Sequence, residues 1–472
     1  MSKSIVLSVN GLLNRALMSL KLTSIDQVDS ALTGSRDQKN HQTVKEKILG
    51  YKSLTSYHPH TLHHVMKSLG HLPAPLLERL ITQLKGPTAE QYPHANAHLR
   101  LILAVNRKLK IPLDRSPMHE LRERFAADAV AMQAPKVWKQ TGDNIIRHIK
   151  LSNIRRFTKK GETIIHWEDT VIANADDGDM TIRCYQADVS TKKISFKKRR
   201  IANPDETVML FFHGGGFCIG NIDTHHEFCH AVCARTGWSV VSVDYRLAPE
   251  HPTPAALRDC IAAYAWLAEN CHTLNALPSR IVLAGDSAGG GLSTLLAQQL
   301  TASTVHDWLN LDIDGQTMFD LLQGLPKPLA QMPIYPVTDV ETNYPSWELY
   351  GDGLLLDHAD VAVFGDACFK NSLLPRQHIL NAPILGDNRK VCATYIVAAE
   401  LDVLRDQALA YAKQLQNHGV VVETYTVLGA PHGFIHLMSV HEGLGQETSN
   451  IIDSFARFVH DLMISDDTQL AA

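Results

Sequence analysis

The chain has 472 residues, of which 45% are hydrophobic and 20% are charged, and its formal net charge is −4 at pH 7. This composition is ordinary for a globular protein, and it excludes the strongly basic field that nucleic-acid binding requires. The length allows two or three domains.

The first ten residues lack the layout of a signal peptide, because Ser8 and Asn10 interrupt their apolar run. No stretch approaches the roughly 18 apolar residues that a membrane-spanning helix needs. Eight cysteines occur, none in a C-x-x-C pair, and Cys229 and Cys233 stand one helical turn apart as expected free thiols. We therefore expect a cytoplasmic protein without a transmembrane segment.

Residues 1–108 are expected to form an N-terminal helical extension. Apolar residues recur there at helical spacing, and prolines divide the segment into short helices. The stripes are Leu12, Leu13, Ala16, Leu17 and Leu20; Leu76, Leu77, Leu80, Ile81 and Leu84; and Leu99, Leu101, Ile102 and Val105. Packing within the protein is favoured, with a second subunit, the catalytic region or lipid as alternative contacts.

The same segment carries a patch of histidines, His58, His60, His63, His64 and His71. No cysteine or carboxylate lies nearby at the spacing of metal ligands. The pattern therefore favours a solvated helix face over a metal site.

Residues 109–160 are expected to contain cap-forming helices and a linker. Ser116 followed by Pro117 predicts a helix capped by Ser116 that runs to Pro135. Residues 163–172 and 180–185 then predict a hairpin. The basic run at 192–200 is more typical of an exposed loop than of a phosphate or membrane site.

From residue 208 onward, expected strands and helices alternate. Strands are expected at 208–212, 239–243, 281–284, 332–335, 394–398 and 420–426, and helices at 227–236, 255–271, 292–300, 408–417 and 447–463. This alternation predicts a mostly parallel sheet flanked by helices over residues 161–472. Functional side chains of such sheets gather at the carboxyl ends of the strands.

The stretch Gly285-Asp-Ser287-Ala-Gly289 follows the expected strand at 281–284 and precedes a helix. This is the G-x-S-x-G pattern of a nucleophile elbow, in which the serine is exposed at a sharp turn. Ala288 would then offer its N–H at the start of a helix, where an oxyanion is stabilised. An incidental serine in a glycine-rich connection is the alternative.

The three consecutive glycines of His213-Gly214-Gly215-Gly216-Phe217 follow another expected strand. They allow the backbone to approach a reacting atom, which predicts the second part of an oxyanion hole. A phosphate-binding loop is less well supported, because neither G-x-G-x-x-G nor a P-loop is present.

A serine nucleophile needs a base and a carboxylate that orients it. Asp402 and His432 both follow expected strands downstream of Ser287, and they are the favoured partners. His436 is the competing base. Glu400 and Asp406 are the competing carboxylates, with Asp406 expected to cap the next helix.

Five motifs stand in a family order: His-Gly-Gly-Gly-Phe at 213–217, Tyr-Arg-Leu-Ala-Pro-Glu-His-Pro at 245–252, Gly-Asp-Ser-Ala-Gly-Gly at 285–290, Asp-Val-Leu-Arg-Asp at 402–406 and His-Gly-Phe at 432–434. With them, residues 116–465 resemble the hormone-sensitive lipase family of α/β hydrolases and its bacterial esterase relatives. The resemblance implies an α/β-hydrolase fold with a helical cap, part of it inserted at about 340–372. The stretch 245–252 is expected to be scaffold beside the site.

The resemblance also implies the catalytic residues Ser287, Asp402 and His432, with oxyanion donors at Gly214, Gly215 and Ala288. A serine carboxylesterase or lipase is expected, acting on a small-molecule ester or lipid of short to medium acyl chain, without a metal or organic cofactor. A hydrolase of an amide, lactone or acetylated sugar remains an alternative, as does a ligand-binding protein on the same scaffold. A homo-oligomer is left open, and so are the roles of residues 1–108, 192–200 and 301–330.

Overall fold

The computed structural model describes residues 61–110, 112–138, 164–187, 206–301, 315–341 and 343–470. The expected stripe at Leu12 to Leu20, the histidines His58 and His60 and the basic run at 192–200 lie outside the described residues.

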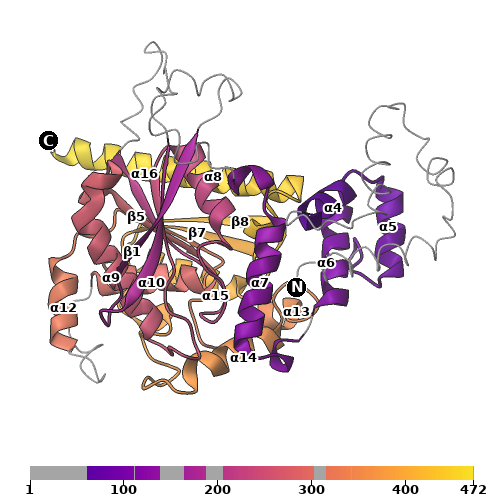
Figure 1. Cartoon of the computed structure of the whole chain (residues 1–472), viewed down its shortest axis with the longest axis horizontal. Coiled ribbons are helices and arrows are strands. Elements are labelled where there is room, and N and C mark those ends of the chain that lie inside the picture. Colours follow the sequence, from indigo (N-terminus) through magenta and orange to yellow (C-terminus); the bar gives the residue numbers. More distant parts are fainter. Residues whose placement is uncertain are drawn as a thin grey trace, which may run out of the picture.

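One eight-stranded sheet forms the centre of the molecule (Figure 1). Its strands are β1 (Ile165–Ala173), β2 (Asp179–Ala187), β3 (Val208–Phe212), β4 (Ser239–Val243), β5 (Ile281–Asp286), β6 (Ala330–Ile334), β7 (Ala393–Leu401) and β8 (Val422–Pro431). They lie in the order β1-β2-β4-β3-β5-β6-β7-β8. The β1–β2 hairpin joins β4 in antiparallel fashion, and the other pairs are parallel. The mostly parallel sheet predicted from the sequence is confirmed.

Helices cover both faces of this sheet (Figure 1). They are α4 (Thr61–Leu69), α5 (Ala74–Gln83), α6 (Ala97–Leu109), α7 (Met118–Met132), α8 (His226–Thr236), α9 (Ala255–Asn270), α10 (Ala288–Gln299), α12 (Gly315–Gly324), α13 (Pro345–Tyr350), α14 (His358–Phe369), α15 (Arg405–Asn417) and α16 (Glu442–Leu470). Helices α8 and α16 contribute to one apolar cluster, and α9, α10 and α15 contribute to the other. Each face of the sheet therefore has its own core.

The central strands β3 and β5 are buried along their whole length. A strand buried on both faces needs a continuous apolar run rather than alternation, and Val208 to Phe212 is such a run. Phe212 at the end of β3 pairs with Gly285 near the end of β5. This register makes the glycine-rich loop after β3 and the serine turn after β5 leave the sheet side by side.

The described part of the N-terminal extension shares a core with the sheet. Leu80, Leu101 and Leu103 are almost completely buried in the same cluster as Phe211 of β3. The contact continues through polar groups, since the His98 ring stacks on that of His441 with centroids 5.2 Å apart. Helices α4 to α6 are thus packed within the protein, as the simplest interpretation of their apolar stripes predicted.

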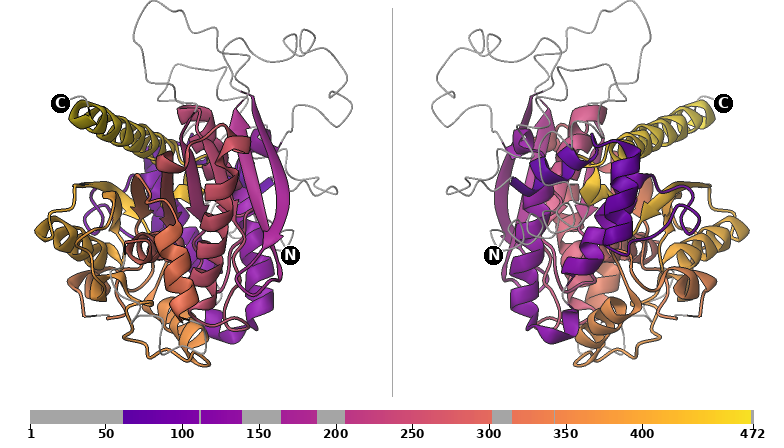
Figure 2. Two further views of the ribbon diagram at one scale, coloured as in Figure 1. Left: turned by 90° about the vertical axis from the view of Figure 1, so that its left-hand side faces the viewer. Right: turned by 90° about the vertical axis from the view of Figure 1, so that its right-hand side faces the viewer.

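Several helix boundaries differ from the sequence-based expectations; for example, α10 already begins at Ala288 and α15 at Arg405. Helix α7 begins at Met118, with Pro117 at its N-cap position, so Ser116 does not cap it. The C-terminal helix runs from Glu442 to Leu470, several residues longer at each end than expected. It projects beyond the body of the molecule (Figure 2). None of the described helices is both long and apolar enough to cross a lipid bilayer.

Candidate active site

Ser287 stands at a sharp turn between β5 and α10. Its backbone has φ 54° and ψ −119°, a conformation that non-glycine residues rarely adopt. Two hydrogen bonds hold the turn: the Ser287 N–H donates to the Ile334 carbonyl at 2.8 Å, and Val337 N–H donates to the Ser287 carbonyl at 3.0 Å. A Cβ atom on Gly289 would lie 2.0 Å from the Phe212 carbonyl oxygen, so only glycine fits there. The glycine pattern of the elbow therefore has a direct steric cause.

The structure brings Ser287, His432 and Asp402 together in one chain of hydrogen bonds. His432 Nδ1 lies 2.8 Å from Asp402 Oδ2, and His432 Nε2 lies 2.8 Å from Ser287 Oγ. An ionised carboxylate only accepts hydrogen bonds, so the Nδ1–H of His432 must donate to it. The Nε2 atom then has a free lone pair and accepts from the Ser287 hydroxyl. Asp402 is itself held by the N–H of Leu404, at 2.9 Å.

The competing carboxylates have other partners. Glu400 pairs with His94 at 2.8 Å and accepts the Gly429 N–H. Asp406 lies inside the first turn of α15 and accepts the Ser346 N–H at 2.8 Å from α13. The expectation that Asp406 caps the helix was wrong, because the helix already begins at Arg405. Neither carboxylate is hydrogen-bonded to His432.

The first glycine of the loop after β3 does not fit its predicted role as an oxyanion donor. Gly214 N–H already donates to Asp286 Oδ1 at 2.7 Å. Gly215 and Gly216 instead line the cavity that contains Ser287, whereas Gly214 does not. Gly215 has φ 123°, and a Cβ there would lie 2.1 Å from the Ile219 carbonyl oxygen. The prediction for Gly214 is corrected because its N–H is used inside the protein.

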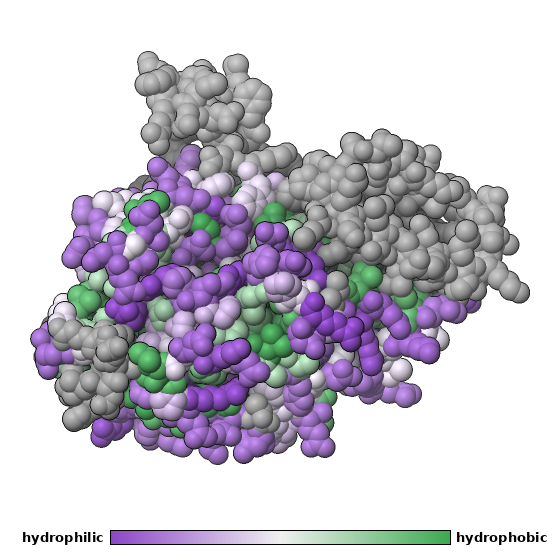
Figure 3. Space-filling model, turned by 60° about the horizontal axis from the view of Figure 1, so that its bottom comes forward, coloured by the Kyte–Doolittle hydropathy of each residue, from purple (hydrophilic) through white to green (hydrophobic). Residues whose placement is uncertain are grey.

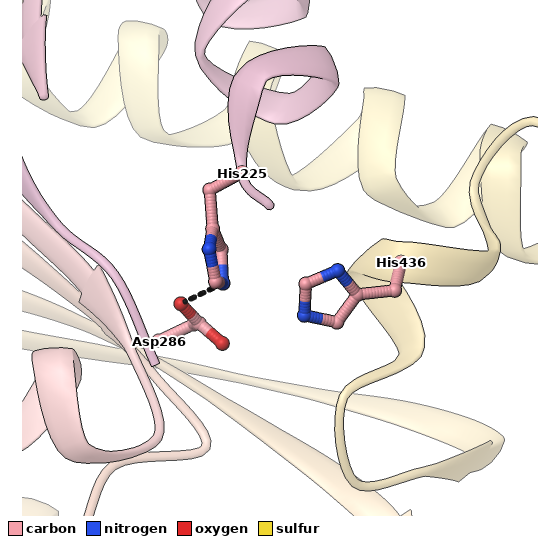
Figure 4. Close-up of side chains that lie close together, drawn as sticks. All are labelled: His225, Asp286 and His436. Atoms are coloured by element: carbon pink, nitrogen blue, oxygen red, sulfur yellow. Dashed lines mark ion pairs between the residues drawn. The ribbon is translucent and has the colours of Figure 1, made fainter. Parts of the chain in front are cut away.

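Behind this loop lies a cluster of the buried His225 and Asp286 and the half-buried His436 (Figure 4). His225 precedes α8, Asp286 ends β5, and His436 lies in the short 3-10 helix Phe434–Leu437. His225 Nε2 is 2.9 Å from Asp286 Oδ1, and the His225 and His436 rings meet edge to face with centroids 4.6 Å apart. His436 is therefore part of this cluster, and no described hydrogen bond joins it to Ser287.

The protonation states of the cluster follow from burial and contact. Burial alone would raise the pKa of Asp286, but the charge and hydrogen bond of His225 and the Gly214 N–H outweigh it and lower the pKa to about 2. Burial, with the neighbouring His225, lowers the pKa of His436 to about 3. An ionised Asp286 thus faces a neutral His436, and it holds the glycine-rich loop after β3 through Gly214.

The three residues of this cluster are also of the types that bind metal ions. Their ligand atoms lie within 4.8 Å of one another, which makes them the candidate metal group among the described residues. The two hydrogen bonds to Asp286 Oδ1 already satisfy its charge. We therefore interpret the cluster as a hydrogen-bonded support of the loop.

Two tyrosines support the site from behind, and only one lies in a motif. The Tyr245 hydroxyl donates to the His213 carbonyl at 2.6 Å, and the two rings stack 4.2 Å apart, which agrees with the expected scaffold role of residues 245–252. The Tyr335 ring lies 4.7 Å from that of His432. Tyr335 follows β6 without any motif around it, so the sequence carried no signal for its place beside the base.

Ser287 and His432 open into a cavity of about 410 Å³ with mainly apolar walls. Its lining comes from α7, α13 and α14, from the glycine-rich loop after β3 and from the start of α15. The apolar lining residues include Phe125, Ala129, Met132, Phe217, Trp347, Leu356, Val361, Phe364 and Leu404. Hydrophobic side chains also reach the surface near the middle of the face on the α14 side, between hydrophilic ones (Figure 3). The cavity suits the apolar part of a small molecule.

Polar contacts attach the expected cap region to the rest of the chain. Arg122 of α7 donates to the Cys218 carbonyl at 2.6 Å and pairs with Glu250. Lys110, just after α6, pairs with Asp357 at 2.6 Å and Asp360 at 2.5 Å at the start of α14. Lys110 also lines the cavity, as does Asn106 of α6, so the N-terminal extension contributes to the wall of the site. No pattern in the sequence indicated this contact.

Known proteins resemble this chain in sequence. A family model described as "alpha/beta hydrolase fold" matches residues 209–436. "Lipase 2" of Moraxella sp. is 54% identical over 432 residues, which cover 90% of this chain and 95% of that protein. The chain belongs to the alpha/beta hydrolase fold family.

Further members of this family are similar over the catalytic region. "Ethyl acetate hydrolase" of Pseudomonas putida is 33% identical over 237 residues, covering 50% of this chain and 68% of that protein. Among solved structures, a hyperthermophilic esterase from the archaeon Pyrobaculum calidifontis superposes with a TM-score of 0.58 at 26% identity. That likeness covers 78% of this chain and 99% of the esterase.

Proposed function

We propose that this α/β hydrolase is a serine carboxylesterase or lipase of the hormone-sensitive lipase type, which hydrolyses esters of short to medium acyl chain. The observation that carries the proposal is the hydrogen-bonded chain Ser287–His432–Asp402 at the wall of an apolar cavity. The names of the relatives, which include a lipase and an ethyl acetate hydrolase, support ester bonds as the target.

In the proposed reaction, His432 Nε2 takes the proton of Ser287 while Oγ attacks the ester carbonyl. Asp402 holds the His432 ring in its tautomer and balances the charge of the imidazolium. His432 then gives the proton to the leaving alcohol, and an acyl-enzyme remains on Ser287. Water attacks the acyl group with the same base, which releases the acid and restores the serine.

The developing negative charge on the carbonyl oxygen needs hydrogen-bond donors. We assign this role to the N–H groups of Gly215, Gly216 and Ala288. Gly216 thus replaces Gly214 among the donors that the family resemblance implied. Gly215 and Gly216 line the cavity, and Ala288 is the first residue of α10, where the helix dipole favours an anion. A lost donor of this kind costs about 3–4 kcal/mol of transition-state stabilisation.

The compartment and the substrate follow from the same features. None of the eight cysteines forms a disulfide bond, and six of them are buried, which suits a reducing cytoplasm as the place of action. The apolar lining of the cavity favours an alkyl acyl chain over a sugar.

Hydrolysis of p-nitrophenyl esters from acetyl to palmitoyl, with wild type and Ser287→Ala side by side, tests the proposal. We expect the highest kcat/KM at short to medium chains and its loss in Ser287→Ala. Hydrolysis restricted to palmitoyl and similar chains would instead identify a lipase of long chains. No Ser287-dependent cleavage of any ester would contradict the proposal and turn attention to amides, lactones or simple ligand binding.

A further inference from the structure

Asp128 stands on the wall of the catalytic cavity in an otherwise apolar stretch of α7. Its neighbours Phe125, Ala129 and Met132 line the same cavity through the same helix. Asp128 therefore borders the space that an ester would occupy. The reaction proposed above does not use it.

One oxygen of the half-buried Asp128 side chain is buried without a partner. Its Oδ1 atom is inaccessible to solvent and has no hydrogen-bond partner among the described residues. Burial raises the pKa of Asp128 to about 6, although Arg124 on the same helix acts in the opposite direction. With a pKa of about 6 the carboxylate is still mostly ionised at neutral pH, and its Oδ1 atom has lost its water without replacement, which costs free energy of folding.

The other carboxylates around the cavity differ in this respect. Asp286 accepts the Gly214 N–H, and Asp360 accepts from Lys110. Asp339 accepts a hydrogen bond from the Tyr344 hydroxyl, and Glu341 accepts one from the Gln377 side chain. Lys110 pairs with Asp357 and Asp360, so it is not available to pair with Asp128 as well. Among the carboxylates that line the cavity, Asp128 is thus the one with no described hydrogen bond or ion pair.

We propose that Asp128 is a substrate-recognition residue that accepts a hydrogen bond from a hydroxyl group carried by the ester. This inference rests on the proposed ester hydrolysis and specifies its substrate class: an ester with an apolar body and a free hydroxyl. A hydroxyl fits better than an ammonium group, because the apolar walls make the transfer of a charged amine from water more costly. The hydroxyl would donate to Asp128 the hydrogen bond that no described residue supplies.

The same geometry makes a prediction about stability. An unpaired buried carboxylate destabilises the folded state, and proteins retain such groups where function needs them. Replacing Asp128 with leucine should therefore raise the thermal midpoint of unfolding. A residue with a structural role would show the opposite change.

The test compares matched substrates that differ by one hydroxyl. On the alcohol side these are butyl butyrate, 3-hydroxypropyl butyrate and 3-aminopropyl butyrate; on the acyl side they are p-nitrophenyl heptanoate and 6-hydroxyhexanoate. The proteins are full-length wild type, Asp128→Leu, the shape-preserving Asp128→Asn, and Glu123→Gln as a control on an exposed position of the same helix.

In at least one pair we expect the ratio of kcat/KM for the hydroxylated over the apolar ester to fall about tenfold or more in Asp128→Leu, as the loss of a hydrogen bond to a charged group predicts. The ratio for Asp128→Asn should lie between those of wild type and Asp128→Leu, and the ratio for Glu123→Gln should equal that of wild type. The thermal midpoint should rise in Asp128→Leu.

Unchanged ratios in both pairs, or a change confined to the amino ester, would overturn the assignment of a hydroxyl. A lower thermal midpoint in both Asp128 variants would mark the residue as structural and overturn the inference as well. In each of these cases, Ser287-dependent cleavage of the apolar esters would leave the proposed function standing. Its absence in wild type would overturn both.

Discussion

Gly214 N–H and Asp286 Oδ1 lie 2.7 Å apart, although the two residues are 72 positions apart in the chain. Asp286 is the residue before Ser287, and Gly214 is the residue before the two glycines that line the cavity. One hydrogen bond therefore links the nucleophile turn to the loop proposed to bind the oxyanion. The relative position of the two depends on an ionised, buried Asp286.

Replacing this carboxylate should damage both stability and catalysis. In Asp286→Asn, the pairing with His225 is lost, and breaking a buried pair costs about 3–5 kcal/mol of unfolding free energy. We also expect kcat to fall at least about tenfold, because the loop is no longer held at its distance from Ser287. Urea unfolding and ester hydrolysis measure the two effects. Asp320→Asn on the exposed side of α12 is the control, and equal behaviour of the two variants would refute the link.

The steric account of the elbow predicts opposite results for two glycines. Gly289→Ala places a Cβ 2.0 Å from the Phe212 carbonyl, and we expect a loss of several kcal/mol in stability or failure to fold. Gly324→Ala, at the end of α12, meets no atom within 4 Å and should be neutral or gain about 0.5–1 kcal/mol. Thermal unfolding distinguishes them. A well-folded, fully active Gly289→Ala would show that the turn is looser than described.

Features that depend on residues close together in the chain could be predicted from the sequence, whereas contacts between distant segments could not. The elbow could be predicted because its strain is local and only glycine fits at position 289. Alternating strands and helices predicted the parallel sheet in the same way. The partners of Ser287 were favoured by their places after strands, and their hydrogen bonds now agree with that choice.

The errors lie where a contact joins distant segments. Nothing near Gly214 indicates that its N–H is used by Asp286, because that depends on the register between β3 and β5. Asp128 was not singled out because its place at the cavity depends on the rotation of α7. Likewise, apolar spacing predicted α5 and α6 but not that Lys110 would reach α14.

Helices α4 to α6 should unfold together with the catalytic region. Leu101 is completely buried in the core cluster that includes Phe211, so Leu101→Ala should cost about 2–5 kcal/mol. Leu349→Ala, at a site that is 60% exposed, should change little. Circular dichroism and ester hydrolysis should lose their signals in one transition at a lower urea concentration. Loss of helix at low urea with full activity would instead indicate an independent N-terminal unit.

Buried neutral histidines should make the protein sensitive to acid. Burial lowers the pKa of His213, His226 and His436 to about 3, below the value near 6.5 in the unfolded chain. Their contribution is complete above pH 6.5 and is lost as the pH falls toward 3, because the unfolded chain then binds more protons. Each histidine contributes a slope of about 1.4 kcal/mol per pH unit in that window.

Urea unfolding at pH 8, 6.5, 5 and 4 measures this slope in wild type and in His436→Gln. The raised pKa of Asp128, about 6, acts in the opposite direction, so the net slope is smaller than the histidine sum. We expect the free energy of unfolding to fall on acidification. Its slope against pH should be smaller in His436→Gln by the contribution of one proton, about 1.4 kcal/mol per pH unit. The same slope in both proteins would show that His436 is already protonated in the fold or does not titrate.

The central claim is that Ser287 is the nucleophile activated by His432. The most direct measurement is labelling with a fluorophosphonate, followed by peptide mass spectrometry, in wild type, Ser287→Ala, His432→Gln and His436→Gln. We predict one label on the Ser287 peptide of wild type, none in Ser287→Ala, a rate lower by about four orders of magnitude in His432→Gln, and a rate within about tenfold of wild type in His436→Gln. Labelling at another residue, or equal loss in both histidine variants, would contradict the account.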